Sequence, residues 1–169
     1  MLITLTCQAM LPVSRRRLAT ALAVVALAVP LLTACASPVH LTPAAKADTV
    51  GCADVIVRLP TTVEGQRQRD TDAQSTSAWG SPAGILLTCG ITTPTVSSLA
   101  CFSPGGVDWL ADTTGPGDKT AVYTTYGRVP GVRVVVDTTQ VPTDTNVLFD
   151  IAAAVKLLPQ KHHCQSVSG

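Results

Sequence analysis

The sequence predicts an α+β fold, in which a small antiparallel sheet is covered on one face by a C-terminal helix and stapled by disulfides. Residues 120–126 and 132–137 are rich in Val, Thr and Tyr. The five residues between them include two glycines, a pattern typical of an antiparallel hairpin. Residues 145–158 carry apolar side chains at helical spacing. Several strands followed by one helix favour a sheet with the helix packed on one face.

A first strand is predicted over residues 53–59. Val55, Val57 and Leu59 alternate with their neighbours along this run, which a proline then ends. The next segment, 61–78, is polar and has no periodicity, so it is predicted to be a loop or irregular segment.

Two short apolar runs predict further strands before the hairpin. Residues 85–89 lie between Gly84 and Gly90 and suit a buried strand, and residues 107–111 form a second candidate. The glycine-rich residues 115–118 are expected to make the turn that leads into the hairpin.

The helix predicted over residues 145–158 has recognisable start and stop signals. Thr143 and Asp144 offer N-cap side chains, and Pro159 ends the helix. Its core-facing stripe is predicted to consist of residues at i, i+3 and i+4 spacing, namely Leu148, Ile151, Ala152, Val155 and Leu158.

The N-terminus carries an export signal. A cluster of three arginines, 15–17, precedes the uncharged residues 18–32, which are too few to cross a hydrocarbon core of about 30 Å comfortably. The run ends on Leu-Thr-Ala and then Cys35, a pattern typical of bacterial lipoproteins. We expect residues 1–34 to be removed and a lipid to be attached to Cys35. An ordinary signal peptide and an uncleaved anchor are the alternatives, and the start codon (Met1 or Met10) and the Sec or twin-arginine route stay open.

Removal of the signal peptide changes the charge and defines the organisation. The whole chain has 12 basic and 11 acidic residues. Without the three signal-peptide arginines, nine basic residues remain and the net charge is −2. A nucleic-acid-binding protein would normally show a clustered basic excess, so no nucleic-acid partner is expected. Residues 35–51 are predicted to be a lipid-anchored tether and residues 52–169 a single globular domain.

Four cysteines remain after Cys35 is assigned to lipid. Their even number in an exported domain predicts two disulfides, for which three pairings are possible. We favour Cys89 with Cys101 and Cys52 with Cys164. A metal site is the alternative, but the sequence contains no C-x-x-C pair.

Several short motifs in a fixed order resemble an exported lipoprotein-type domain of unknown function found in actinobacteria. The similarity covers residues 52–164. It is carried by Leu59-Pro60, residues 65–71 (GQRQRDT), residues 78–82 (AWGSP), residues 87–90 (LTCG), residues 106–110 (GVDWL) and residues 125–130 (TYGRVP). This sequence departs from the family pattern at Thr88, where an arginine is expected, and at Gln68, which separates two arginines. The resemblance implies export, a lipid anchor and paired cysteines, and it implies no activity.

Three arginines are candidate ligands for an anion. Arg67, Arg69 and Arg128 are expected in turns, and their planar guanidinium groups suit a carboxylate or phosphate if the fold brings them together. The alternative, which we favour, is a polar face on which they form salt bridges with Glu64, Asp70, Asp72 or Asp108.

Other candidate residues have simpler interpretations. Trp79 and Trp109 are predicted to anchor the core rather than to line a ligand groove. His162 and His163 are expected to be solvated rather than metal ligands, so no metal site and no cofactor are predicted. The sequence lacks a nucleophile elbow and a phosphate-binding glycine loop, and Glu64 is its one glutamate.

These observations lead to three hypotheses about function. We favour a non-enzymatic accessory domain, anchored by lipid on the outer face of the cytoplasmic membrane, that binds a protein or another component of the cell envelope. The second hypothesis is a lipoprotein that binds a small ligand or anion through Arg67, Arg69 and Arg128. The third is an envelope hydrolase, which would need two ionisable groups with shifted pKa values in one cleft.

Overall fold

The structure, a computed structural model, describes residues 37–112 and 119–165. The described residues form one compact unit. The predicted signal peptide (residues 1–34), Cys35 and the turn expected at residues 115–118 lie outside the described residues. Within the described ranges, no helix has the length and apolar character needed to cross a membrane.

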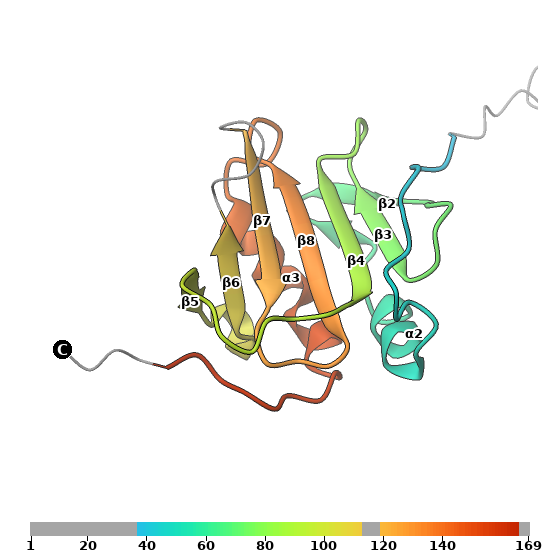
Figure 1. Cartoon of the computed structure of the whole chain (residues 1–169). Helices are drawn as coiled ribbons and strands as arrows, with labels where there is room; N and C mark the ends of the chain where they lie inside the picture. The colour runs from blue at the N-terminus through green and yellow to red at the C-terminus, as the bar shows by residue number, and fades with distance from the viewer. Residues whose placement is uncertain (1–36, 113–118, 166–169) are drawn as a thin grey trace, which may run out of the picture. The chain divides into compact units, whose positions relative to one another are not determined.

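An eight-stranded antiparallel sheet forms the body of the domain, as predicted (Figure 1). The order of strands across the sheet is β1-β2-β3-β4-β8-β7-β6-β5. Their bounds are β1 Thr62–Val63, β2 Gln66–Arg69, β3 Thr76–Trp79, β4 Ile85–Ile91, β5 Ala100–Phe102, β6 Trp109–Asp112, β7 Thr120–Thr125 and β8 Gly131–Asp137. The hairpin of β7 and β8 and the strands β4 and β6 confirm the predicted strands of this region.

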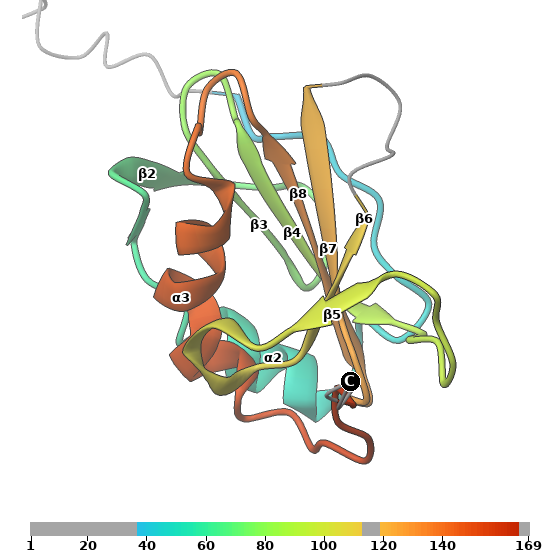
Figure 2. The same ribbon diagram turned by 90° about the vertical axis from the view of Figure 1, so that its left-hand side faces the viewer.

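Two α-helices contribute to the single hydrophobic core. They are α2 (Val50–Ile56) and α3 (Asp144–Val155), and a 3-10 turn, η2 (Pro104–Gly106), packs against α3. Figure 2 shows α3 lying along one face of the sheet. The predicted apolar stripe of this helix is confirmed, because Leu148, Ile151, Ala152, Val155 and Leu158 are all buried.

The predicted strand over residues 53–59 is wrong, because this part of the chain belongs to α2 and the turns that follow it. Cys52, Val55 and Leu59 are buried, which is the i, i+3, i+7 spacing of one helix face. The loop predicted over 61–78 is also wrong in part, since it contains β1, β2 and β3. Val63 and Gln66 pair across a two-residue turn in which both residues have positive φ, as a tight hairpin requires.

Residues 37–49, predicted as part of a tether, are hydrogen-bonded to the sheet. The Val39 N–H donates to the carbonyl oxygen of Asp70 at 2.8 Å, and the Lys46 N–H donates to the carbonyl oxygen of Gly90 at 3.0 Å. Gly90 has φ +101°, and a Cβ at this position would lie 2.5 Å from the backbone nitrogen of Ala47. Only glycine allows the two backbones to approach this closely, so the segment is part of the folded unit.

The four cysteines form two disulfides, as predicted, but the pairing we favoured is wrong. Cys52 is bonded to Cys89, and Cys101 is bonded to Cys164. The observed pairing follows from the positions of α2 and of the C-terminal segment. Helix α2 packs on β4 beside Cys89, and the C-terminal segment returns to the edge strand β5.

Candidate functional site

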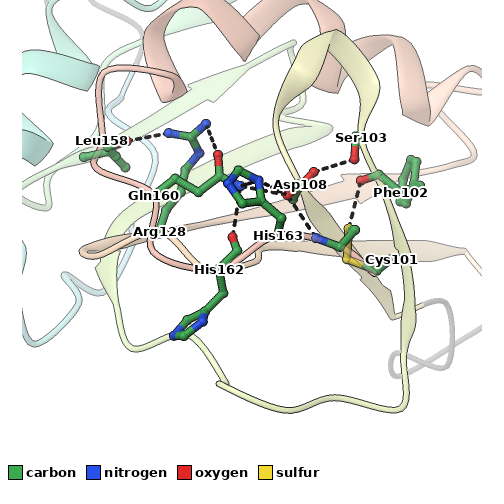
Figure 3. Close-up of polar contacts among 10 residues, drawn as sticks. Cys101, Phe102, Ser103, Asp108, Arg128, Leu158, Gln160, His162 and His163 are labelled. Atoms are coloured by element: carbon green, nitrogen blue, oxygen red, sulfur yellow. Dashed lines mark hydrogen bonds and ion pairs between the residues drawn. A yellow bond between two sulfur atoms is a disulfide. The ribbon is translucent and has the colours of Figure 1, made fainter. Parts of the chain in front are cut away.

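Asp108 is the centre of a polar network that joins the start of β6 to the C-terminal segment (Figure 3). Its side chain is buried, and Oδ1 accepts a hydrogen bond from the Ser103 hydroxyl. Oδ2 accepts from Gln160 Nε2 at 2.7 Å and from the Cys164 N–H at 3.1 Å, and His163 Nδ1 lies 3.2 Å away. Burial raises the pKa of this carboxyl. The hydrogen bonds and the nearby imidazole outweigh burial and hold the pKa of Asp108 below its usual value.

Arg128 lies on the other side of Gln160 in this network. The side chain is buried, and its guanidinium donates to the carbonyl oxygens of Leu158 and of Lys156, the latter at 3.3 Å, just beyond α3. Nη2 donates to Gln160 Oε1 at 2.9 Å, so the amide of Gln160 connects the arginine to Asp108. Burial lowers the pKa of Arg128, and the charge of Asp108 opposes this effect. The guanidinium therefore satisfies carbonyl groups of its own chain. We call Asp108, Arg128, Gln160 and the Cys101–Cys164 disulfide the C-terminal latch.

The polar network around Asp108 includes a serine and a histidine, but these three residues are not in a catalytic order. In a hydrolytic triad the imidazole lies between the serine and the carboxylate, where it takes the serine proton. Here the carboxylate of Asp108 lies between Ser103 and His163 and contacts both. This arrangement fixes the C-terminal segment and does not activate the serine hydroxyl.

The structure does not bring the three candidate arginines together. Arg67 and Arg69 belong to β2, which β3, β4 and β8 separate from β7, whereas Arg128 follows β7. Arg69 donates to the carbonyl oxygens of Gly80 at 3.2 Å and Ser37 at 2.9 Å. Arg67 is exposed.

The acidic partners that we expected for the arginines are used differently. Asp72 pairs with His40 and also accepts a hydrogen bond from the Leu41 N–H at 2.9 Å. These hydrogen bonds lower the pKa of Asp72. Asp108 pairs with His163, and Arg128 reaches it only through Gln160.

The two tryptophans are core residues, as predicted. Trp79 and Trp109 are fully buried, and Trp79 Nε1 donates to the carbonyl oxygen of Pro60 at 3.0 Å. His162 and His163 are exposed, and no cluster of three or more possible metal ligands occurs among the described residues.

The sheet face opposite α3 carries a cation that our sequence reasoning did not select. Arg133 on β8 is exposed and lies between two threonines in the cross-strand register, Thr88 on β4 and Thr124 on β7. The neighbouring row on this face consists of Leu86, Val135 and Val122. The alternation of β8 was the available signal, because Val132, Val134 and Val136 occupy the buried face and Arg133 must then point the other way.

Two hollows border this face, which we call the open face. One, of about 340 Å³, is lined by Arg133, Thr124 and Asp112 together with residues of the 91–99 segment. The other, of about 410 Å³, lies beside the Cys101–Cys164 disulfide. Leu99 lines both. Residues 92–99 are held in place by the hydroxyl of Tyr126, which donates to the carbonyl oxygen of Thr95 at 2.9 Å. A binding pocket usually encloses a few hundred Å³, so the open face offers space for a partner group next to a guanidinium.

A family model for a protein of unknown function, DUF3515, matches residues 17–163. Comparisons with curated proteins and with solved structures gave no significant match. Among the described residues, the matched range includes the eight strands, α2 and α3, and three of the four disulfide-bonded cysteines, and Cys164 lies one residue beyond it. The chain therefore belongs to the family of proteins of unknown function DUF3515.

Proposed function

We propose that the protein is a lipoprotein of the cell envelope, anchored through Cys35 on the outer face of the cytoplasmic membrane, whose domain binds a partner and is not an enzyme. The observation that carries this proposal is the pair of disulfides in a domain of this size. Disulfides persist in oxidising compartments and are rare in the cytosol, so they indicate an extracytoplasmic protein. The arginine cluster, the apolar run and the small residues before Cys35 support a lipid anchor.

The described ionisable groups support binding more than catalysis. Asp72, Asp108 and Arg128 have shifted pKa values, and each is hydrogen-bonded to the backbone of a segment that it holds in place. Asp137 likewise has a lowered pKa, because it accepts hydrogen bonds from Thr139 and Gln140 in the turn after β8. A hydrolase would direct two such groups into one cleft.

The open face is the surface that we propose for the partner. It combines apolar side chains with one exposed guanidinium, Arg133, and two hollows. A partner segment with an acidic side chain would pair with this guanidinium. The alternative of an anion site built from Arg67, Arg69 and Arg128 lacks this support. Three strands separate β2, which carries Arg67 and Arg69, from β7, which Arg128 follows, and Arg128 is bonded to its own chain.

Lipidation is tested by labelling. The chain expressed in a bacterial host with a labelled fatty acid should yield a membrane-bound, labelled product, and Cys35→Ser should remove both the label and the membrane association. Cys7→Ser is the matched control, because it lies within the segment expected to be removed and should leave the label unchanged. Persistence of the label in Cys35→Ser would contradict the anchor.

The binding face is tested by charge reversal. Arg133→Glu should abolish the ability of the gene to complement a deletion strain, because an acidic partner group would then meet a like charge. Arg58→Glu, an exposed arginine after α2, is the control and should complement normally. Both variants should retain the wild-type thermal midpoint, since surface substitutions usually change stability by no more than about 0.5 kcal/mol. Normal complementation by a folded Arg133→Glu protein would exclude this face as the functional surface.

A further inference from the structure

We infer that the end of the sheet that holds Ser37, Arg67 and Gly80 lies directly against the lipid headgroups, with the Arg67 guanidinium contacting lipid phosphate. The inference rests on the proposed lipid anchor at Cys35 and adds to it the surface of the domain that faces the membrane. The tether predicted from the sequence would hold the domain away from the bilayer. In the inferred arrangement the domain instead rests on the bilayer surface.

The first argument is that very little chain lies between the anchor and the domain. Ser37 is the second residue after Cys35, and its carbonyl oxygen already accepts a hydrogen bond from Arg69 at 2.9 Å. Two residues later the Val39 N–H is bonded to Asp70. A fully extended chain covers at most about 3.6 Å per residue, so the lipidated residue can lie only about 7 Å from Ser37. No free length remains to lift the domain.

Hydrogen bonds place this attachment point at one end of the sheet. Arg69 bridges the carbonyl oxygens of Ser37 and Gly80, and the Gly80 N–H donates to the carbonyl oxygen of Arg67 at 3.0 Å. In Figures 1 and 2 the described chain starts at the upper end of the sheet, with the β3–β4 turn, and α2 lies at the lower end. Strand β4 spans seven residues between these ends, which corresponds to about 20 Å. The anchor therefore reaches only one of them.

The side chains at this end suit a headgroup layer. Arg67 is exposed, and its guanidinium makes no hydrogen bond or ion pair with another described residue that would have to be broken. It borders a hollow of about 290 Å³, lined also by Gly65, Gln66, Gly80 and Ser81. A guanidinium binds phosphate through parallel hydrogen bonds, and the small, polar lining admits a headgroup. Four carboxylates lie near this end. Asp72 is paired with His40, Asp70 is exposed on the segment after β2, and Asp150 accepts a hydrogen bond at 2.8 Å from the N–H of Glu64, the fourth.

In the competing orientation, the opposite end of the domain would face the membrane. Four exposed apolar residues lie there, namely Val50 in α2, Val57 just after α2, Val129 in the β7–β8 turn and Leu157 just after α3. Apolar side chains at a surface can also contact a membrane. The roughly 20 Å between the two ends places these residues beyond the reach of the anchor. In the inferred orientation they face away from the bilayer.

The test measures which backbone amides lie near the headgroups. The chain of residues 35–169, carrying either its natural lipid or a maleimide lipid coupled to Cys35, is placed in nanodiscs that contain a spin-labelled headgroup. The NMR signals of Gly65, Gly80 and Ser81 should be strongly broadened, whereas those of Ala53, Val129 and Leu157 should be retained. Broadening at α2 and the β7–β8 turn, or equal broadening throughout, would overturn the inference. The coupled sample tests the orientation even if cells attach no lipid, so this failure is distinguishable from failure of the proposed anchor.

One insertion and two arginine substitutions refine the test. A 20-residue Gly/Ser insert between Ala36 and Ser37 has a root-mean-square reach of roughly 25 Å and should make the broadening weak and even. Arg67→Gln should lower the population in contact with anionic headgroups about fivefold, the factor given by about 1 kcal/mol per basic side chain near such a surface. Arg58→Gln, at the other end of the domain, should change nothing. Equal effects of the two arginine substitutions would remove Arg67 from the contact.

Discussion

Replacement of both Cys101 and Cys164 by serine should lower the free energy of unfolding by roughly 4 kcal/mol on the chain-entropy relation for a loop of this length. The disulfide closes a 63-residue loop and fixes the C-terminal segment to the edge strand β5. Domains of this size are commonly stable by about 5–15 kcal/mol, so this loss is a large fraction of the total. Urea unfolding of the oxidised wild-type and variant proteins measures it.

The second disulfide provides the comparison for the first. Cys52→Ser with Cys89→Ser opens a 37-residue loop and should cost a similar amount, slightly less on the same relation. Non-reducing peptide mapping should recover Cys52 linked to Cys89 and Cys101 linked to Cys164. A peptide that joins Cys52 to Cys164 would contradict the connectivity described above.

Asp108→Ala should destabilise the domain by about 3 kcal/mol, because truncation leaves three donors in partly buried hydrogen bonds without their shared acceptor. The carboxylate is the shared acceptor for Ser103, Gln160 and the Cys164 N–H. Its removal also deprives the buried Arg128 of the nearby negative charge. The control is Asp54→Ala on the exposed side of α2, which should change stability by no more than about 0.5 kcal/mol.

The same substitution should alter the pH dependence of stability. The folded state lowers the pKa of Asp108 from 3.8, so its contribution is fully present above about pH 4. It is lost as the pH falls from that value through the lower pKa of the folded state. The wild-type protein should therefore lose stability more steeply than Asp108→Ala as the pH falls below about 4. Asp72 and Asp137 titrate in the same direction in both proteins, so parallel curves would show that Asp108 contributes little.

The sequence predicted the elements whose apolar patterns fit only one kind of structure. The β7–β8 hairpin and α3 have long patterns of this type. The segment 53–59 is ambiguous, because Val55 and Leu59 satisfy both an alternating strand pattern and one face of a helix. Val57, which distinguishes the two, is 77% exposed, as expected for a helix and not for that strand face. Short apolar runs of this kind are ambiguous by periodicity alone.

Strands β1 and β2 were missed for a different reason. They lie at the edge of the sheet, and β2 has a polar sequence without a fully buried residue. The only local signal was the Glu64-Gly65 pair, which forms the two-residue turn with positive φ at both positions. Their pairing is therefore encoded in the turn and not in hydrophobic alternation.

The candidate site could be predicted only in part, because long-range packing decides which residues meet. The arginines at positions 67, 69 and 128 were identified by type and proximity to turns, yet their partners depend on strand order. Burial of Arg128 requires the C-terminal segment to return across the end of the sheet, and no local pattern in residues 127–130 specifies this. Arg133 was predictable in principle from the alternation of β8.

The two covalent loops have a consequence for the order in which the chain matures. They follow one another along the sequence without overlapping, since the first closes at Cys89 and the second opens at Cys101. In a chain that crosses the membrane N-terminus first, each cysteine's native partner is then the next unpaired thiol to arrive on the far side. Oxidation in order of emergence gives the native bonds directly, without a later exchange of partners. Interleaved or nested loops would not have this property. A bond between Cys52 and Cys164, for example, would require the Cys52 thiol to stay unpaired while Cys89 and Cys101 emerged.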